Sequence, residues 1–519
     1  MNKFFTRYSH RLLVAGIVVS FVLLSVGSAM RESLTYDEIV HSEEGINHLQ
    51  KHTFTADTYN PPLIRELQML PTALRIVTER LFANRLITVL LGALLLIIVY
   101  FTARKYFGKE AGLFALVFLA FDPNMLAHSH YVTMDAGTAL FFFVAYSALI
   151  YFWEKPTFGR TIMFGISLGL ALASRVMLLP YMGAAVLLLG FVKKWKLPSL
   201  RYVGAALLIS LLVIWATYFF RWEVVIAKGG SPGRVSQQLK YFAAAQKLPV
   251  LESGLNILEN RPLPLGNYLA TMKNSFLRGM QNTAKPGWYE LVVNVLLKTP
   301  IPLLFFTLLG LWKLKKSLFI VPVIGILAVA VGTGMESRVR YVLAIYPFLA
   351  IIAAIGIRMV WRSQIPLRGR KYGKLGVGVL LLWYIVGTLA SFPHFVSYAN
   401  ELVPRNERYL YFTDSNIDWG QSLPDLASYI AKARPSHVSF SYFGRDNGND
   451  HGLVSNRQWG SYKFEEICAF HEIALPYDGE RLVAISVSNW YGCGYSKEER
   501  FSKEKIVHAV ADSILIFTN

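Results

Sequence analysis

Charged residues are scarce in this sequence. Asp, Glu, Lys and Arg make up 16% of its 519 residues, whereas soluble domains carry roughly 25%. Hydrophobic residues make up 54% of the chain, and the mean hydropathy is +0.39. These values exclude an ordinary soluble domain and predict an integral membrane protein.

Cysteine is rarer still. The chain has only Cys468 and Cys493, both near the C-terminus, which excludes a cysteine-rich metal knuckle and a thiol relay. A disulfide between them requires that this end of the chain lie outside the reducing cytoplasm. The sequence leaves that pairing open.

Acidic residues are fewer than basic ones. The sequence has 33 of them against 52 Lys and Arg, a formal net charge of +19. A basic excess also occurs in nucleic-acid-binding proteins, but in a multi-pass protein Lys and Arg collect in cytoplasmic loops and face anionic headgroups. We therefore expect membrane lipids, and no nucleic acid, as partners.

Long apolar runs are abundant. A bilayer core of roughly 30 Å needs about 20 apolar residues per helix. Eleven candidate spans follow: 12–30, 86–103, 111–127, 135–153, 161–175, 177–192, 202–219, 291–312, 317–334, 341–361 and 375–392. The short pair on either side of Arg175 is interpreted as two helices. Merging them would reverse the side of the membrane on which every later loop lies.

Loop charges give the orientation. With eleven spans and a cytoplasmic N-terminus, the short outer loops hold only Arg175, Arg338 and Arg340, whereas the cytoplasmic loops are rich in Lys and Arg, as the positive-inside rule requires. The first run is longer than the roughly 7–15 residues of a signal-peptide core, so we expect a retained helix. The sequence predicts a multi-pass protein of the inner (plasma) membrane.

Composition changes near residue 393. Residues 1–392 are expected to form a helical transmembrane domain with outer loops at 31–85 and 220–290. Residues 393–519 contain the strand-like stretches "HVSFSYFG" and "RLVAISVSNWYG" and the helical stretch "QSLPDLASYIAKA". They predict a small α/β domain outside the cytoplasm.

The first outer loop opens with "TYDEIVHSEEGINHLQ", which places Asp37 and Glu38 directly after the first span. A carboxylate at headgroup depth is partly desolvated, so its pKa can rise and it can act as a general base unless a cation holds it ionised. The alternative is a solvated helix start whose acids complement the helix dipole.

The second outer loop, "FDPNMLAHSHYVTMD", ends at Asp135. Together with Asp37 and His128, this residue forms a possible ligand set for a divalent cation (Mg, Mn or Zn), since oxygen and imidazole ligands suit these ions. The alternative is that Asp135 caps its helix and the histidine lies at the interface.

A third cluster, "ESRVRYVLAIYP", carries Arg338 and Arg340. Two guanidinium groups at the end of a span suit a lipid-linked phosphate, although they also suit snorkelling to headgroups. Acids in two outer loops and arginines near lipid phosphates fit sugar transfer from a polyprenyl phosphate. A base would deprotonate the acceptor hydroxyl, positive charge would stabilise the leaving phosphate, and the anomeric centre would invert.

These loops, with "YNPPLIRELQMLP", "ASRVMLLPY", "FPHFVSYANELV" and "DSNIDWGQSL", resemble GT-C glycosyltransferases of the protein O-mannosyltransferase and lipid A aminoarabinose transferase superfamily. The resemblance implies a GT-C fold and an inverting membrane enzyme. Its donor would be a polyprenyl-phosphate sugar, and its acceptor a protein or glycolipid hydroxyl, or a phosphate.

The resemblance also implies roles for individual residues. Asp37 matches the catalytic base, with Glu38 beside it and Asp135 as the second acid. The donor phosphate would be bound by Arg65, which falls where relatives often have Lys, and by Arg175, Arg338 and Arg340. This chain departs from the family at Asn60, where relatives commonly have a histidine before two prolines; His41 or His128 would have to substitute.

Two other classes of protein remain open from the sequence. A transporter or flippase would place ionisable residues at mid-membrane, but only Lys298, in a run interrupted by Pro300 and Pro302, fits that pattern. An inactive scaffold would use the C-terminal domain to bind a partner. The sugar and the acceptor are not encoded in a readable motif, because sugar discrimination depends on a few hydrogen bonds.

Overall fold

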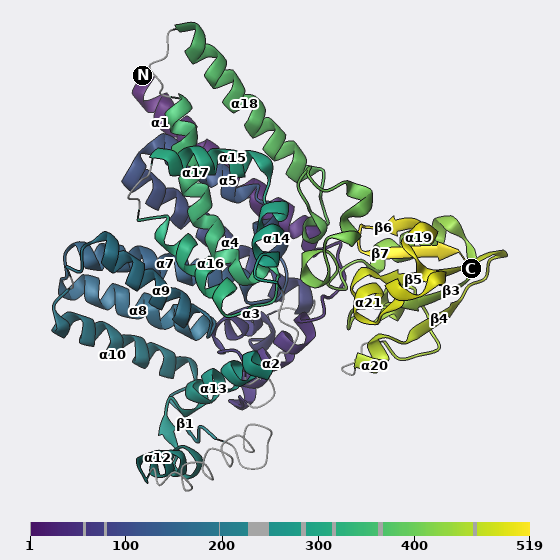
Figure 1. The fold of residues 1–519 in the computed structure, drawn as a ribbon, viewed down its shortest axis with the longest axis horizontal. Helices are drawn as coiled ribbons and strands as arrows, with labels where there is room; N and C mark the ends of the chain where they lie inside the picture. The colour runs from purple at the N-terminus through teal and green to yellow at the C-terminus, as the bar shows by residue number, and fades with distance from the viewer. Residues whose placement is uncertain are drawn as a thin grey trace.

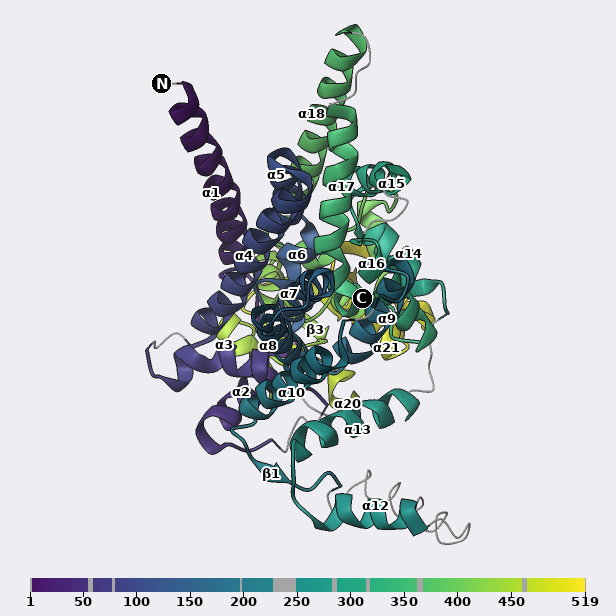
Figure 2. The same ribbon diagram turned by 90° about the vertical axis from the view of Figure 1, so that its left-hand side faces the viewer.

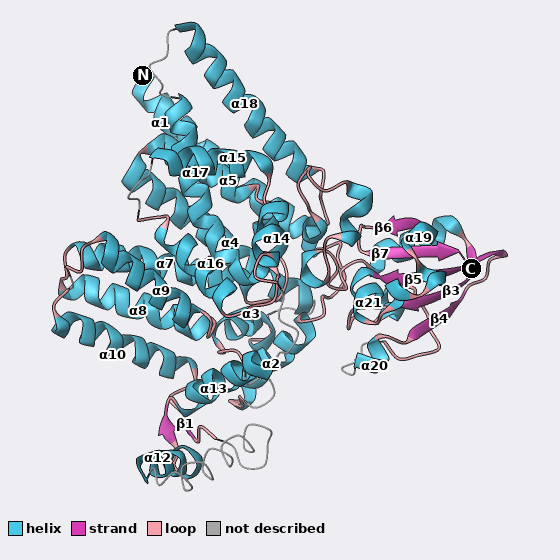
Figure 3. Cartoon of the chain, in the orientation of Figure 1, coloured by secondary structure: helices cyan, strands magenta, loops and turns pink. Residues whose placement is uncertain are grey.

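The protein has two parts, a helical bundle and a C-terminal α/β domain beside it (Figure 1). The computed structural model describes residues 2–54, 59–76, 80–196, 198–226, 249–281, 287–313, 318–361, 367–459 and 464–518. Parts of the predicted outer loop 220–290 therefore lie outside the described residues. Strands are almost confined to the C-terminal domain (Figure 3).

Every predicted span lies on a helix. The helices concerned are α1 (Asn2–Ala29), α4 (Arg80–Phe107), α5 (Lys109–Ala120), α7 (Asp135–Glu154), α8 (Phe158–Ser174), α9 (Leu178–Val192), α10 (Leu200–Thr217), α15 (Ile301–Lys313), α16 (Val321–Gly332), α17 (Tyr346–Trp361) and α18 (Leu367–Leu389). Figure 2 shows α1, α5, α17 and α18 directed toward one end of the bundle, with α12 (Pro249–Asn260) and α13 (Gly266–Gln281) at the other end.

Among the described residues, six helices are long and apolar enough to cross a membrane, and a bent pair raises the number to seven. The helices α8, α9 and α16 are apolar but shorter. These helices confirm a multi-pass membrane protein, whereas the count of eleven spans stays a prediction. Separate helices α8 and α9 on either side of Arg175 confirm that this pair is not one long span.

Two predicted spans are interrupted. The run 111–127 is split, because Asp122 caps the short helix α6 (Pro123–His128) by accepting a 2.9 Å hydrogen bond from the Met125 amide. The run 291–312 is the pair α14 (Glu290–Lys298) and α15, which is bent by 109°. Pro300 lies at that bend, where its ring and missing N–H end a helix.

Lys298 is the residue that fitted the transporter hypothesis. It lies at the end of α14, next to this bend. Its side chain is buried, and its amine donates hydrogen bonds to the backbone carbonyls of Val396 and Asn416. The cation therefore joins the bent pair to the segment that leads into the C-terminal domain.

The C-terminal domain is built on a five-stranded sheet in the order β4-β3-β5-β7-β6. Its strands are β3 (Pro435–Ser441), β4 (Phe470–Ala474), β5 (Gly479–Ser486), β6 (Ile506–Val510) and β7 (Ile514–Thr518). Only β3 and β5 pair in parallel; the other neighbours are antiparallel. Alternate residues of the strands face two separate cores, and α19 (Leu423–Ala433) covers one of them.

The predicted α/β character of this domain is confirmed, with one local correction. The stretch "RLVAISVSNWYG" is a strand only as far as Ser486, and "VSNWYG" forms α21 (Val487–Gly492). The chain leaves the sheet there because Ser488 binds Asp418, its amide donating to the carboxylate over 2.8 Å. Asn489 is held in turn by the Ile467 carbonyl at 2.9 Å.

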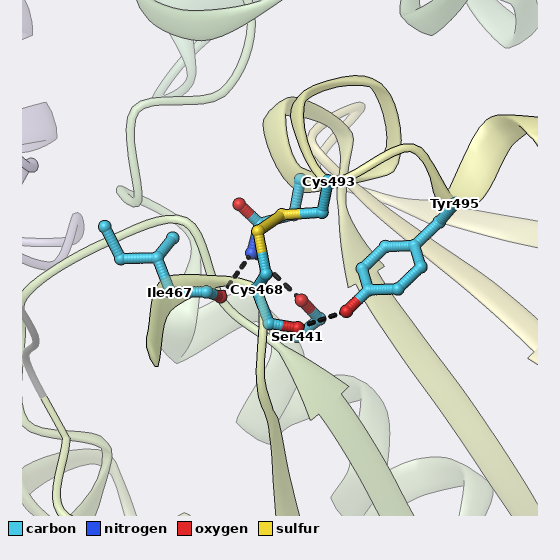
Figure 4. Close-up of a disulfide and its surroundings, with 6 residues drawn as sticks. Ser441, Ile467, Cys468, Cys493 and Tyr495 are labelled. Atoms are coloured by element: carbon cyan, nitrogen blue, oxygen red, sulfur yellow. Dashed lines mark hydrogen bonds between the residues drawn. A yellow bond between two sulfur atoms is a disulfide. The ribbon is translucent and has the colours of Figure 1, made fainter. Parts of the chain in front are cut away.

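The two cysteines form a disulfide, with their Cα atoms 5.6 Å apart (Figure 4). Cys493 follows α21, and Cys468 follows the short helix α20 (Phe464–Ile467). The hydroxyl of Tyr495 donates to the carbonyl of Cys468 beside the bridge. A bridge closing a loop of 25 residues stabilises a domain by about 3 kcal/mol in the chain-entropy account.

The helices of the first predicted outer loop are α2 (Glu38–Lys51) and α3 (Leu63–Ala73). A two-stranded ribbon, β1 (Trp222–Glu223) with β2 (Leu263–Pro264), lies near α12 and α13. A 3₁₀ segment, η1 (Val339–Ile345), precedes α17 and carries the arginine cluster. The candidate site lies where the start of α2, the start of α7 and η1 come together.

Candidate active site

Asp37 and Arg340 form an ion pair at the centre of the site. Asp37 directly precedes α2, and its Oδ2 lies 2.7 Å from Nη1 of Arg340 in η1. Burial alone would raise the pKa of Asp37, but the guanidinium of Arg340, with His41 and Arg338, holds that pKa well below its usual range. Of the two possibilities for this carboxylate, the structure shows the one in which a cation keeps it ionised.

Access to this pair is one-sided. The side chain of Arg340 is 7% exposed, whereas that of Asp37 is 28% exposed. Among the described residues, Oδ1 of Asp37 accepts no hydrogen bond, while Oδ2 is occupied by Arg340. One oxygen of this partly exposed carboxylate is therefore left without a hydrogen-bond donor among the described residues.

Asp135, the second predicted acid, begins α7 and lies in the same electrostatic cluster. Its Oδ1 is 2.6 Å from Nη1 of Arg175, and its Oδ2 is 3.9 Å from Nδ1 of His128. Arg340 also acts on Asp135, so the two acids share one guanidinium. The structure thus brings Asp37, Asp135, Arg175 and Arg340 together.

His128 is uncharged in this setting. Burial lowers its pKa to about 3, against the opposing effect of Asp135. A neutral imidazole is able to ligate a metal, yet the described residues contain no group of three His, Cys, Asp or Glu side chains that could hold one. The predicted set Asp37, Asp135 and His128 is not among such groups, and an arginine contacts one oxygen of each carboxylate. The divalent cation stays a prediction.

Arg338 lies two residues from Arg340 and is more exposed, at 27%. Its Nη2 is 3.1 Å from Glu336 and 3.1 Å from Asp414 of the C-terminal segment. The neighbouring Asn416 accepts a 3.0 Å hydrogen bond from the Val339 amide and donates one to the Ser337 carbonyl. The "DSNIDWGQ" segment therefore fixes the backbone on both sides of Arg338.

Glu38, the neighbour of Asp37, is fully buried and has all its acceptor positions filled. Arg85 binds both carboxylate oxygens, at 2.9 and 2.7 Å. The Val132 amide donates to Oε1 and the Thr35 amide to Oε2, each over 2.8 Å. Glu38 therefore joins the first loop to α4 and to the second loop. Its catalytic role stays a prediction.

Arg65, the predicted donor-phosphate residue of α3, is also fully buried. Its Nε donates to Nδ1 of His41 over 3.1 Å. Arg65 therefore contacts a residue one helical turn after Asp37, since the His41 amide donates to the Asp37 carbonyl. Direct phosphate binding by Arg65 stays a prediction.

Trp419 is a site residue that the sequence did not reveal. It comes from the C-terminal segment but belongs to the buried core of the bundle. Its ring lies 4.4 Å from the guanidinium carbon of Arg340, and its carbonyl accepts a 2.9 Å hydrogen bond from the Tyr36 amide, next to Asp37. A tryptophan among turn-forming polar residues gave no signal for a contact made across the whole chain.

Glu32 is a second such residue. It accepts hydrogen bonds from the Tyr131 hydroxyl at 2.6 Å, and its other contacts are His130 at 2.7 Å and His394 at 3.2 Å. Burial would raise its pKa, but His130 and His394 lower it to about 2. His394 also contacts Asp425 of α19 at 3.1 Å, so this cluster fastens the C-terminal domain to the first loop.

Comparison with known proteins gives a match to a family model over part of the chain and a fold shared with solved structures. Residues 60–218 match the family described as dolichyl-phosphate-mannose-protein mannosyltransferase. ArnT from Cupriavidus metallidurans in the apo state has a TM-score of 0.54 at 12% identity, covering 99% of this chain and 98% of its own. The chain has a GT-C glycosyltransferase fold. The match over residues 60–218 and the fold agree with the predicted superfamily and the predicted enzyme class.

Two further solved structures have a fold similar to that of this chain. The undecaprenyl phosphate complex of the same ArnT has a TM-score of 0.52 at 12% identity, covering 98% of this chain and 97% of its own. The oligosaccharyltransferase AglB from Archaeoglobus fulgidus, with an inhibitory peptide and a dolichol-phosphate, has a TM-score of 0.50 at 14% identity. That match covers 89% of this chain and 62% of AglB. No curated sequence matches the chain.

Proposed function

We propose that this GT-C enzyme transfers a sugar from a polyprenyl-phosphate carrier to a hydroxyl of a protein or glycolipid, with inversion, at the outer face of the inner membrane. One observation carries the proposal. Asp37 is ionised, its Oδ1 accepts no hydrogen bond from the described residues, and it lies with Asp135 among several arginines. A base beside fixed positive charge is what departure of a phosphate requires.

The reaction follows from these groups. Oδ1 of Asp37 takes the proton of the acceptor hydroxyl, whose oxygen attacks the anomeric carbon. The bond from that carbon to the phosphate oxygen breaks, and the polyprenyl phosphate leaves with the electron pair. Arg338 is exposed enough to meet the phosphate, while Arg340 and Arg175 balance the carboxylates. No step is routed through a metal.

The carrier and acceptor are proposed partly by analogy. One ArnT structure holds undecaprenyl phosphate, and the AglB structure holds a dolichol-phosphate and a peptide. A lipid phosphate of this kind fits the arginine cluster of the present chain. We assign the site to the outer face because the loop charges place Asp37 and Asp135 there, with the N-terminus in the cytoplasm.

The test compares cells that have and lack the protein. Mass spectrometry of extracytoplasmic proteins and envelope glycolipids should show one sugar modification that disappears with the gene and returns with the intact chain. Membranes from the complemented cells should transfer the labelled sugar from its polyprenyl-phosphate carrier to that acceptor. An unchanged profile of proteins and glycolipids, with no transfer from any polyprenyl-phosphate sugar, would reject the proposal.

A further inference from the structure

A groove of about 600 Å³ lies between α1 and α4, away from the candidate active site. Each helix contributes one stripe of side chains at helical spacing. The residues used below are Arg11, Val14 and Val18 of α1, and Ile97, Phe101 and Arg104 of α4. Figure 2 shows α1 leaning away from α5 toward its N-terminus.

The two charges of the groove lie at the same end. Arg11 precedes the apolar positions of α1, and Arg104 follows those of the antiparallel α4. That end is fastened by Tyr100, whose hydroxyl accepts from Nη1 of Arg104 at 3.2 Å and contacts Nε2 of His10 at 2.8 Å. The groove therefore has two arginines at one end and a mostly apolar lining along the rest.

We propose that this groove binds an anionic phospholipid. The phosphate lies between Arg11 and Arg104, and an acyl chain runs along the valines of α1 and the aromatic and aliphatic residues of α4. Guanidinium groups pair with phosphate through charge-assisted hydrogen bonds. Basic pockets between transmembrane helices bind anionic headgroups in this way, and a zwitterionic lipid would add an ammonium group beside two cations.

This groove is distinct from the place of the sugar carrier. Arg11 lies 18 residues before Ala29, the end of α1, a separation of about 27 Å at 1.5 Å per residue. Asp37 follows beyond that far end. A phosphate held by Arg11 and Arg104 therefore cannot be the phosphate that leaves at Asp37, and the inference is independent of the proposed reaction.

The test uses the full-length protein in detergent and native mass spectrometry with added phosphatidylglycerol or phosphatidylethanolamine. The intact protein should retain phosphatidylglycerol in preference. The double variant Arg11→Gln/Arg104→Gln should lose that preference by at least about tenfold. Arg201→Gln is the matched control, because Arg201 is exposed at the start of α10 and contacts its own neighbour Tyr202.

A second variant tests the apolar part. Val18→Trp fills the channel and leaves both arginines in place, so it should also weaken phosphatidylglycerol retention. Thermal unfolding of each variant checks that the fold is kept. Equal retention of phosphatidylglycerol by the double variant and the intact protein would overturn the proposal, as would an equal loss in Arg201→Gln. Undecaprenyl phosphate as the only lipid lost on mutation would assign the groove to the carrier instead.

Discussion

Nη1 of Arg340 lies 2.7 Å from Oδ2 of Asp37, joining residues 303 positions apart in the sequence. This contact decides the state of the candidate base. Without it, a carboxyl in a partly buried position would tend toward the protonated form; with it, the carboxylate stays ionised and keeps Oδ1 free for an acceptor. The predictions below test the parts of this arrangement separately.

Asp37→Asn should reduce sugar transfer by at least about 100-fold, because the amide cannot take the acceptor proton. The amide oxygen can still accept from Arg340, so folding and donor binding should persist. Transfer from labelled polyprenyl-phosphate sugar in membranes measures the effect. Glu43→Gln, an exposed change on the same helix, is the control and should be neutral. Full turnover by Asp37→Asn would remove this residue from the mechanism.

Arg340→Gln should move the acid limb of activity to higher pH. Arg340 lowers the pKa of Asp37, so its removal raises that pKa, and protonation inactivates the base at a pH where the intact enzyme is still active. The pH profile of kcat/KM measures the shift. Arg340→Lys keeps the charge and should show a smaller shift. An acid limb at the same pH in all three proteins would contradict this account of Asp37.

Trp419→Leu should lower kcat by about tenfold, the size expected from losing one partly desolvated cation–π contact. The ring contacts Arg340 and not the reacting atoms, so Trp419 is a positioning residue. Trp419→Phe keeps an aromatic face and should recover much of the loss. The acid limb should also move upward in Trp419→Leu, as in Arg340→Gln but less. Loss of kcat without any change in the pH profile would indicate a general packing defect.

Glu38→Gln should destabilise the fold. The change leaves Arg85 as a buried charge without its carboxylate, and breaking a buried pair from one side costs about 3–5 kcal/mol. Thermal unfolding in detergent should show a lower midpoint than in Glu43→Gln. If Glu38→Gln folds as well as the intact protein and loses only transfer, then Glu38 takes part in the reaction, as the family resemblance alone would suggest.

Chelation should leave transfer in place. The positive charge around Asp37 and Asp135 comes from Arg340 and Arg175, and the described residues provide no three-ligand cluster. Transfer is measured with EDTA and then with Mg²⁺, Mn²⁺ or Zn²⁺ restored. Loss of transfer with EDTA and its recovery with one ion would support the divalent cation predicted from the sequence.

Local patterns in the sequence predicted much of the fold. Apolar runs located every bundle helix, because crossing a bilayer demands a length and composition that show within one segment. Alternating β-branched and aromatic residues located β3 and the start of β5 in the same way. The interruption near Pro300 was visible for a local reason too, since proline ends a helix wherever it falls inside one.

The sequence by itself thus determined the membrane character, the helices, the α/β tail and the position of Asp37 directly after the first span. Only the tertiary structure decided what each site residue touches. Glu38 turned out to be saturated by Arg85, the carboxylates proposed for a metal hold arginines, and Trp419 entered the bundle from the far end of the chain. Helix and strand periods are set by neighbours a few residues apart, whereas these contacts join distant segments through packing and charge, which no local pattern records.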